Sequence, residues 1–275
     1  MQLSEFELRK EDEMISTEIS VVVPYYSEAD NVLPLVNALH AALDGRAWEV
    51  IFVDDNSPDG TIKAVRQLAA QDPHVRGLLR IGRKGLSSAV IEGILASSAP
   101  IVAVMDGDLQ HDEACLPAMI EALKTGNFDV AVASRHVEGG DSAGLANKWR
   151  HFLSEQGIRI AKSLSVPVND PMSGFFAVQR EWFEAIAPSL TGRGFKILLE
   201  TLLAAPKPVR VKEVPMVFRD RLHGESKLGP QVMIQFGIMI LENVMKKPLF
   251  KRMFWITSSS IFSGIAYKYL TRPKK

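Results

Sequence analysis

The stretch Ile101–Asp108 reads Ile-Val-Ala-Val-Met-Asp-Gly-Asp. Its five mostly branched apolar residues predict a buried parallel strand, and two carboxylates follow where that strand ends. Open α/β sheets bind ligands beyond the carboxyl ends of their strands. Asp106 and Asp108 are therefore candidate ligands for a hard divalent cation, whose remaining positions substrate phosphates can fill. Such a turn in isolation is also typical of a simple polar turn, so the rest of the chain must decide.

The composition is that of a globular protein. The chain has 275 residues, of which 47% are hydrophobic and 23% charged, enough for one sizeable core. Its 32 basic and 32 acidic residues balance, and we expect no nucleic-acid partner. The single cysteine, Cys115, excludes an internal disulfide, and no apolar signal segment precedes the acidic start, so we expect exposure to the cytosol.

Short apolar runs alternate with helical patterns along the first half of the chain. Strands are predicted at 19–23, 50–53, 75–79, 101–105 and 128–133, with helices between them. This alternation indicates βαβ units and a mainly parallel sheet. In the second half we expect helices at 147–164, 181–187 and 195–204 and a strand at 209–218. The chain accordingly divides into an acidic N-terminus (1–18), a main domain (19–228) and a C-terminal segment (229–275).

Matching chemistry follows three of the predicted strands. Pro24–Glu28 follows the first strand, Asp54–Thr61 the second and Asp106–Asp108 the fourth. An aromatic face and carboxylates at neighbouring strand ends can hold a base and a ribose, while a metal takes the diphosphate. The segment Gly82–Gly85 matches neither the dinucleotide fingerprint nor the P-loop, which disfavours a dehydrogenase or a kinase.

Six sequence blocks carry a family resemblance: Val21–Glu28, Val53–Thr61, Asp106–His111, Ser134–Arg135, Asp170–Phe176 and Gly224–Leu228. Together they resemble the family 2 glycosyltransferases, and within them the dolichol-phosphate or polyprenol-phosphate mannosyltransferase type. The second and fifth blocks are the most specific in combination. The resemblance covers residues 19–228 and implies the GT-A fold, a Rossmann-like α/β fold whose mainly parallel sheet is flanked by helices.

The resemblance also implies roles for individual residues. Its nucleoside-binding positions correspond to Pro24, Tyr26, Glu28, Val53 and Asp55. Its sugar-nucleotide and metal turn, which takes Mg²⁺ or Mn²⁺, corresponds to Asp106, Gly107 and Asp108, with Gln110 as a further metal ligand. Its cationic contacts to donor or acceptor phosphates correspond to Arg135, Lys196, Arg221 and Lys227, and its acceptor-phosphate clamp to Arg150 and Ser154. The family's usual Thr-Tyr-Asn-Glu is Tyr25–Glu28 here, which keeps the tyrosine and the glutamate but weakens any role for Ser27.

The residues themselves support parts of this reading. Arg150 and Ser154 are four apart on a predicted helix, so both can point at one phosphate, and a guanidinium suits a phosphate monoester. The segment Arg221–Lys227 has the glycine and polar residues of a mobile closing loop. We expect His111 to cap the helix after the acidic turn and Cys115 to lie in the core. A lipid phosphate is already anionic, so no general base is assigned, although Asp170, or the acidic pair Asp54 and Asp55, could have a base-like or orienting role.

The C-terminal segment indicates a membrane surface. It contains two apolar stretches, 232–241 and 253–267, the second of which is shorter than the roughly 20 residues of a membrane span. Its cations are Lys246, Lys247, Lys251, Arg252, Lys268, Arg272, Lys274 and Lys275. We expect two interfacial amphipathic helices that attach the protein, as a peripheral or monotopic protein, to the cytoplasmic membrane face. The alternative is that these helices pack on the main domain, on another copy or on a membrane-protein partner.

The leading hypothesis is an inverting hexosyltransferase that uses a polyprenyl or dolichyl phosphate as acceptor. The resemblance suggests mannose from GDP-mannose as the donor. UDP-glucose or another nucleotide sugar, used on a lipid or polysaccharide acceptor, is an alternative, and so is a non-catalytic sugar-nucleotide-binding subunit of a membrane complex. A metal-dependent nucleotidyltransferase is disfavoured because no glycine-rich basic signature follows the first strand.

Overall fold

A computed structural model of the chain describes residues 17–141, 158, 166–206, 208–220 and 237–238. The chain separates into two compact units, residues 1–227 and 228–275. The elements below all belong to the first unit. Among the described residues, no helix is long and apolar enough to cross a membrane.

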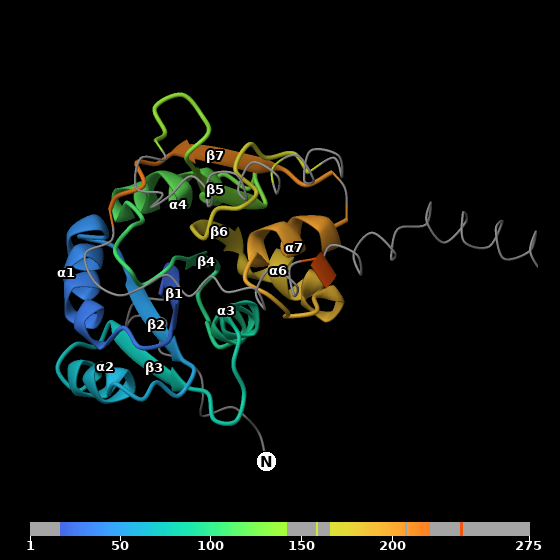
Figure 1. Cartoon of the computed structure of the whole chain (residues 1–275). Helices are drawn as coiled ribbons and strands as arrows, with labels where there is room; N and C mark the ends of the chain where they lie inside the picture. The colour runs from blue at the N-terminus through green and yellow to red at the C-terminus, as the bar shows by residue number, and fades with distance from the viewer. Residues whose placement is uncertain (1–16, 142–157, 159–165, 207, 221–236, 239–275) are drawn as a thin grey trace, which may run out of the picture. The chain divides into compact units, whose positions relative to one another are not determined.

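A seven-stranded sheet forms the centre of the first unit, in the order β3-β2-β1-β4-β6-β5-β7 (Figure 1). Strand β6 runs antiparallel to its neighbours β4 and β5, and all other neighbouring strands are parallel. The sheet is therefore mainly parallel, as the sequence predicts. The strands are β1 (Ile19–Tyr25), β2 (Trp48–Asp54), β3 (Val75–Leu79), β4 (Ile101–Val104), β5 (Val130–Ser134), β6 (Phe176–Gln179) and β7 (Val211–Pro215).

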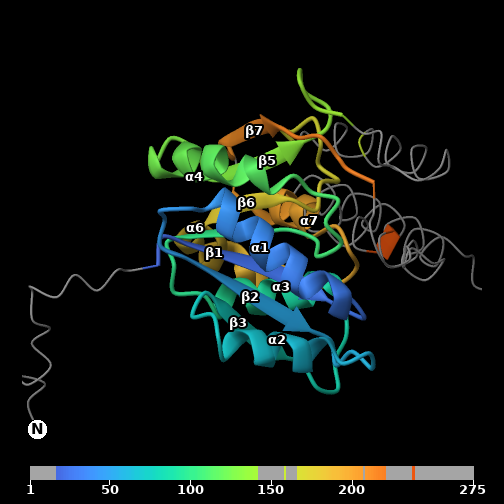
Figure 2. The same ribbon diagram turned by 90° about the vertical axis from the view of Figure 1, so that its left-hand side faces the viewer.

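Helices cover both faces of this sheet. Figures 1 and 2 show α1, α2 and α4 on one face and α3, α6 and α7 on the other. The α-helices are α1 (Val32–Ala42), α2 (Thr61–Ala69), α3 (Leu86–Leu95), α4 (Leu116–Lys124), α6 (Arg180–Ile186) and α7 (Ile197–Ala204). Short 3-10 helices lie at η1 (Ala29–Asn31), η2 (Glu113–Cys115) and η3 (Ala187–Ser189).

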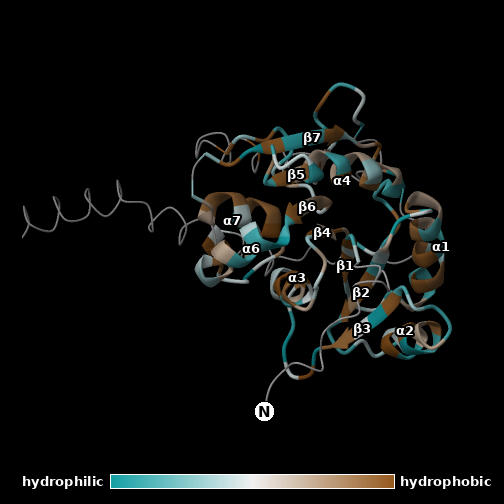
Figure 3. Ribbon diagram, turned by 180° about the vertical axis from the view of Figure 1, so that it is seen from behind, coloured by the Kyte–Doolittle hydropathy of each residue, from teal (hydrophilic) through white to brown (hydrophobic). Residues whose placement is uncertain are grey.

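The core follows from the alternation of side chains along the buried strands. On β1, Val21 and Val23 join the cluster that includes Leu35 of α1. The alternate residue Val22 faces α3, where a Cβ built on Gly93 would lie 2.4 Å from the Val22 Cγ1 atom. Gly93 therefore lets α3 pack directly on the sheet. Hydrophobic colouring in Figure 3 marks β1, β6 and much of α1.

Most predicted elements of the first unit are present, with their boundaries shifted by a few residues. Cys115 is buried in the core, as expected. Strand β6 is the element that the sequence did not predict. It lies between β4 and β5, its residues 176–178 are buried, and the Ser-Gly-Phe-Phe motif leads into it. The predicted helix 147–164 lies outside the described residues except for position 158, and so does most of the C-terminal segment.

Candidate functional site

The carboxyl ends of β1, β2 and β4 bring the three predicted motifs to one edge of the sheet. From β1 the chain passes to β2 and then β3 on one side, and it crosses to the other side of β1 to form β4. Such a reversal of strand order opens a crevice at the strand ends. One non-glycine residue with positive φ follows each of these strands: Ser27 (56°), Asn56 (59°) and Leu109 (61°). Residues held in this region cost on the order of 1–3 kcal/mol and are concentrated at functional sites.

Tyr25 fixes the acidic turn against the end of β1. Its hydroxyl donates a hydrogen bond to the Gly107 carbonyl oxygen at 3.3 Å, and its ring packs on Phe52 of β2 at 5.0 Å between centroids. A Cβ built on Gly107 would lie 1.5 Å from the Tyr25 Cε1 atom. Only glycine therefore fits between the two carboxylates. Burial, followed by the charges of Glu28 and Asp108, raises the pKa of Tyr25 well above its ordinary value, so the phenol remains a donor.

Gly174 brings the segment before β6 onto the same turn. A Cβ built on Gly174 would lie 2.7 Å from the Asp106 Oδ2 atom and 3.1 Å from the His111 Cε1 atom. The Ser173 hydroxyl donates to the Ala133 carbonyl oxygen at 2.8 Å and so anchors this segment to β5. The glycine of the Met-Ser-Gly-Phe-Phe motif therefore provides the space that the Asp106 carboxylate occupies.

His111 supports the acidic turn through a hydrogen bond to its backbone. It does not cap the following helix. Asp112 is the capping residue, because its side chain accepts from the Ala114 amide, and the expectation for His111 was wrong. His111 is buried, and its ring contacts the rings of Phe175 and Phe218 at centroid distances of 5.4 and 5.5 Å. Its Nδ1 atom accepts a hydrogen bond from the Asp106 amide at 3.1 Å. The aromatic neighbours come from segments distant in the sequence, which is why a local pattern could not place it.

The electrostatics around His111 show that the predicted charged residues converge. Burial lowers the pKa of His111, which keeps the ring neutral and Nδ1 an acceptor. The charges of Asp106 and Asp108 oppose this shift, and those of Arg135 and Lys196 add to it. These four charged groups, predicted separately from the sequence, therefore all act on one buried ring.

The acidic turn has the donor chemistry of a site for Mg²⁺ or Mn²⁺. The Asp106 side chain is 41% exposed, whereas Asp108 and Gln110 are buried. The side-chain nitrogen Nε2 of Gln110 donates to the Arg219 carbonyl oxygen at 3.0 Å. The atom of the Gln110 side chain that can ligate a cation is therefore its oxygen. Among the described residues, no group of three or more His, Cys, Asp or Glu side chains could hold a metal. Two carboxylates and one amide oxygen suit a hard cation that shares its remaining positions with phosphate oxygens.

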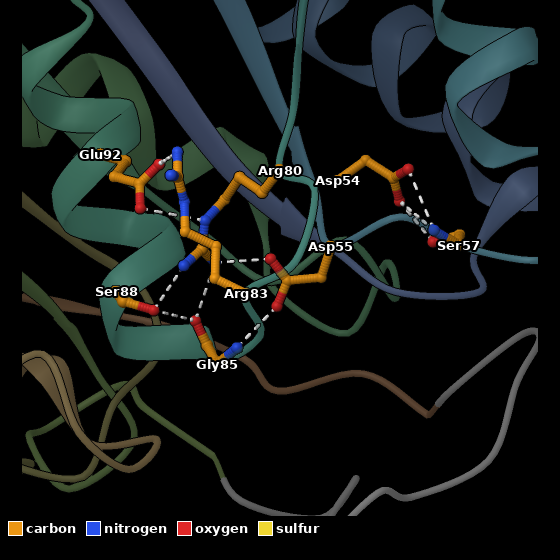
Figure 4. Close-up of polar contacts among 8 residues, drawn as sticks. All are labelled: Asp54, Asp55, Ser57, Arg80, Arg83, Gly85, Ser88 and Glu92. Carbon is orange, nitrogen blue, oxygen red and sulfur yellow. Dashed lines mark hydrogen bonds and ion pairs between the residues drawn. The ribbon is translucent and has the colours of Figure 1, made fainter.

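Several side chains of the block Asp54–Thr61 hold the loops at this edge of the sheet. Asp54 is fully buried and accepts from the amide and hydroxyl of Ser57, which closes the turn (Figure 4). Ser57 and Thr61 oxygens accept from the amides of Ser27 and Glu28 at 2.9 and 3.2 Å. The loops after β1 and β2 are thus held together by side-chain oxygens from one motif.

Asp55 belongs to a network of alternating charges. Its Oδ1 atom accepts from Arg80 at 2.5 Å and its Oδ2 atom from the Gly85 amide at 2.7 Å. Figure 4 shows Asp55 and Arg80 pointing toward one another, with Glu92 of α3 on the far side of Arg80. Arg80 is 1% exposed and directly follows β3. No sequence pattern singles out this residue, because a single arginine after a strand is typical of a solvated surface.

The other predicted nucleoside-binding residues lie beside this network. Pro24 and Val53 are register partners on β1 and β2. The Val53 side chain packs against α3 at Gly93, so a nucleoside could reach this residue only through its backbone. Tyr26 is 36% exposed, and Lys84 Nζ lies 3.1 Å from its hydroxyl and 4.4 Å from its ring centroid. A partly exposed aromatic ring beside a cation is a suitable surface for a base or a ribose phosphate.

Arg135 is held by Asp170. Its Nε and Nη2 atoms donate to the two carboxylate oxygens of Asp170 at 2.7 and 2.9 Å, and its amide donates to Oδ2 at 3.1 Å. Burial alone would raise the pKa of Asp170, but the hydrogen bonds and charge of Arg135 outweigh burial and lower it. The guanidinium has Nη1 left for contacts other than Asp170. Lys196, just before α7, donates to the Met172 carbonyl oxygen at 2.8 Å, which places it beside the Gly174 segment.

Four predicted site residues lie outside the described residues. They are the acceptor-phosphate positions Arg150 and Ser154 and the cations Arg221 and Lys227. The described range 208–220 ends immediately after Arg219, whose amide donates to the Gln110 carbonyl oxygen at 2.8 Å. Their roles stay predictions.

Comparison with known proteins identifies the family. Residues 20–187 match the model of the glycosyl transferase family 2. The chain belongs to that family. The dolichol-phosphate mannosyltransferase of Saccharomyces cerevisiae is 38% identical to this family 2 chain over 233 residues, covering 81% of this chain and 85% of the yeast protein. The Pyrococcus furiosus protein of the same name is 38% identical over 225 residues, which cover 79% of this chain but 61% of that longer protein.

Solved structures support the fold. The glucosyl-3-phosphoglycerate synthase of Mycobacterium tuberculosis in complex with UDP superposes with a TM-score of 0.60 at 19% identity, covering 82% of this chain and 80% of that one. The same enzyme in complex with Mg²⁺ and UDP gives a TM-score of 0.57 at 17% identity, covering 83% and 78%. At this identity the likeness concerns the fold alone. The family 2 chain therefore has the GT-A fold predicted from its sequence.

The contact between Gly174 and Asp106 generates one prediction. Gly174→Ala should displace the Asp106 carboxylate and lower turnover at least about tenfold, because catalytic geometry is sensitive to shifts of about 1 Å. The matched control is Gly77→Ala, whose Cβ would lie 2.9 Å from Val65 Cγ1 between β3 and α2, away from the turn. Both variants should lose some thermal stability, but only Gly174→Ala should lose activity. Equal activity of the two variants would contradict the proposed support of Asp106.

The buried pair of Arg135 and Asp170 generates a second prediction. Asp170→Asn should lower the free energy of unfolding at neutral pH by about 3–5 kcal/mol, because it leaves a buried guanidinium without its anion. The lowered pKa of Asp170 means that its stabilising contribution is present above the ordinary aspartate pKa of about 3.9 and is lost as the pH falls through the lower folded value. Urea unfolding should therefore show a difference between wild type and variant that shrinks in acid. Asp129→Asn, which breaks the more exposed pair with Arg210, is the control and should have a smaller effect. A difference that does not change with pH would refute this account.

Proposed function

We propose that this chain transfers a mannosyl group from GDP-mannose to a dolichyl or polyprenyl phosphate. The observation that carries the proposal is the Asp106-Gly107-Asp108 turn at the point where the strand order reverses, in a chain 38% identical to proteins named dolichol-phosphate mannosyltransferase. The turn is supported by Tyr25, Gly174 and His111 and is accompanied by cations suited to phosphate groups.

The residues at the site suggest how the transfer proceeds. The acceptor phosphate is ionised near neutral pH, so its oxygen needs alignment with the anomeric carbon more than it needs a base. Asp170 is an unsuitable base because its carboxylate is committed to Arg135. Lys196 and the Nη1 atom of Arg135 are suited to hold phosphate oxygens. One in-line displacement inverts the anomeric configuration, so an α-linked donor would give a β-linked lipid product.

Asp106, Asp108 and Gln110 would hold the divalent cation. When bound, a Mg²⁺ or Mn²⁺ ion would neutralise charge on the departing nucleoside diphosphate. Tyr26, Lys84 and Asp55 would surround the nucleoside. The protein would work at the cytoplasmic membrane face, attached through interfacial helices in residues 229–275, where the lipid acceptor presents its phosphate.

A labelled-donor assay tests this function. The full chain is incubated with dolichyl phosphate, Mn²⁺ and separately labelled GDP-mannose, UDP-glucose and other nucleotide sugars, and the lipid phase is extracted. We expect mannose label in the lipid phase only when lipid phosphate is present. Asp108→Asn should reduce the transfer by roughly a hundredfold or more, a loss of about 3 kcal/mol of transition-state stabilisation.

The matched control is Asp44→Asn, an exposed aspartate in the loop between α1 and β2, which should transfer at the wild-type rate. Label from UDP-glucose in the lipid phase would replace mannose by glucose in the proposal. Absence of lipid label from every donor would refute transfer to a lipid phosphate.

A further inference from the structure

Arg80 is a buried cation that none of the predicted roles includes. It directly follows β3 and is 1% exposed. Its neighbours come from the end of β2, from the turn before α3 and from α3 itself. A buried guanidinium is destabilising unless anions and hydrogen-bond acceptors surround it. Its position next to Asp55, one of the predicted nucleoside-binding residues, therefore calls for a functional explanation.

The contacts of Arg80 use its planar fork. Nη1 donates to Asp55 Oδ1 at 2.5 Å and to the Gly85 carbonyl oxygen at 3.2 Å, and Nη2 donates to the Ser88 hydroxyl at 2.6 Å. Nε lies 3.2 Å from Glu92 Oε1 as an ion pair, without the geometry of a hydrogen bond. The groups that Arg80 contacts lie on different sides of its guanidinium, as Figure 4 shows. One lysine ammonium cannot reach all of them.

Charges alternate from the interior to the surface along this network. Asp55 is followed by Arg80, then by Glu92, and then by Arg83, whose Nη2 atom lies 2.7 Å from Glu92 Oε2. The inner part is buried and the Arg83 side chain is 59% exposed. Each charge in the network thus has a neighbour of opposite charge, so the charges of the network compensate one another.

Asp55, Arg80 and Gly85 are each hydrogen-bonded to the other two, which sets the position of the turn before α3. Asp55 accepts from the Gly85 amide at 2.7 Å, while Arg80 donates to the carbonyl oxygen of the same residue. Lys84 directly precedes Gly85 and contacts the Tyr26 hydroxyl and ring. The geometry of Asp55, Lys84 and Tyr26 with respect to one another therefore depends on the Arg80 side chain.

We propose that Arg80 is a positioning residue for the donor: it holds Asp55 and the Lys84–Gly85 turn in the arrangement that binds the nucleoside. This inference rests on the proposed function, because it takes the donor to be a nucleotide sugar bound at these residues. Arg80 acts through Asp55 and Gly85 and has no contact with the reacting atoms. Its loss should therefore weaken donor binding and leave use of the lipid phosphate unchanged.

The experiment compares Arg80→Lys and Arg80→Gln with wild type by calorimetric titration of GDP-mannose, and by donor and acceptor KM. Loss of a charged hydrogen-bonding partner should weaken donor binding by about tenfold to a hundredfold. Lysine should not restore it, and KM for dolichyl phosphate should not change. The matched control is Arg76→Gln. It removes the contact between Arg76 Nη1 on β3 and Glu49 on β2, at the end of these strands opposite to Arg80. This variant should bind the donor as wild type does.

A double-mutant cycle tests whether Arg80 acts through Asp55. In an Asp55→Asn background, Arg80→Gln should weaken donor binding by much less than it does in wild type. Ser88→Ala and Glu92→Gln remove single partners of Arg80 and should weaken donor binding by a smaller factor. They keep the inference testable if the Arg80 variants do not fold.

The outcomes separate the two proposals. Wild-type protein that binds no nucleotide sugar refutes the proposed function. If wild-type protein binds the donor and the folded Arg80 variants bind it equally well, only the positioning role is refuted. The same holds if the Arg80 variants lose only kcat. If the Arg80 variants do not fold, unchanged donor affinity in both Ser88→Ala and Glu92→Gln refutes it equally.

Discussion

The site depends on the packing of the Tyr25 ring against Gly107. This contact connects the end of β1 with the turn after β4, and β1 and β4 are neighbouring parallel strands at which the strand order reverses. The ring also packs on Phe52 of β2, so one buried side chain spans three strands. Because Gly107 separates Asp106 from Asp108, the positions of both carboxylates follow from where this ring lies. Tyr25 is itself part of the hydrophobic core, so the acidic turn is held by a residue that cannot move independently of that core.

Buried ion pairs organise the cationic side of the site. Arg80 is paired with Asp55, and Arg135 with Asp170, in each case with hydrogen bonds to fixed acceptors. Arg219 is paired with Asp112 and Glu113 at the surface next to the acidic turn. These arginines are oriented by aspartates and glutamates of the chain before any substrate is present. Such preorganisation reduces the rearrangement that binding of a charged donor would require.

The sequence predicted the sheet, the acidic turn and the edge where the motifs meet, because apolar runs and strand ends are local features. It missed β6, whose four residues follow a glycine-containing motif and run antiparallel between two other strands. It also missed the partners of Arg80 and His111, because burial of a polar residue depends on segments far apart in the sequence. The motif around Asp54 is typical of a nucleoside site, yet Asp54 itself holds the turn through Ser57. Only three-dimensional contacts separate such supporting residues from those that can face a ligand.

A crystal structure of the full chain with GDP and Mn²⁺ tests the central claim most directly. The account predicts the metal bound by Asp106, Asp108 and Gln110, the diphosphate beside them, and the nucleoside between Tyr26 and the Asp55 network. The described chain also has a cavity of about 320 Å³ at the opposite end of the strands, lined by residues that include Ile101, Lys124 and Gln179. GDP bound in that cavity, or at any place away from the acidic turn, would contradict the account.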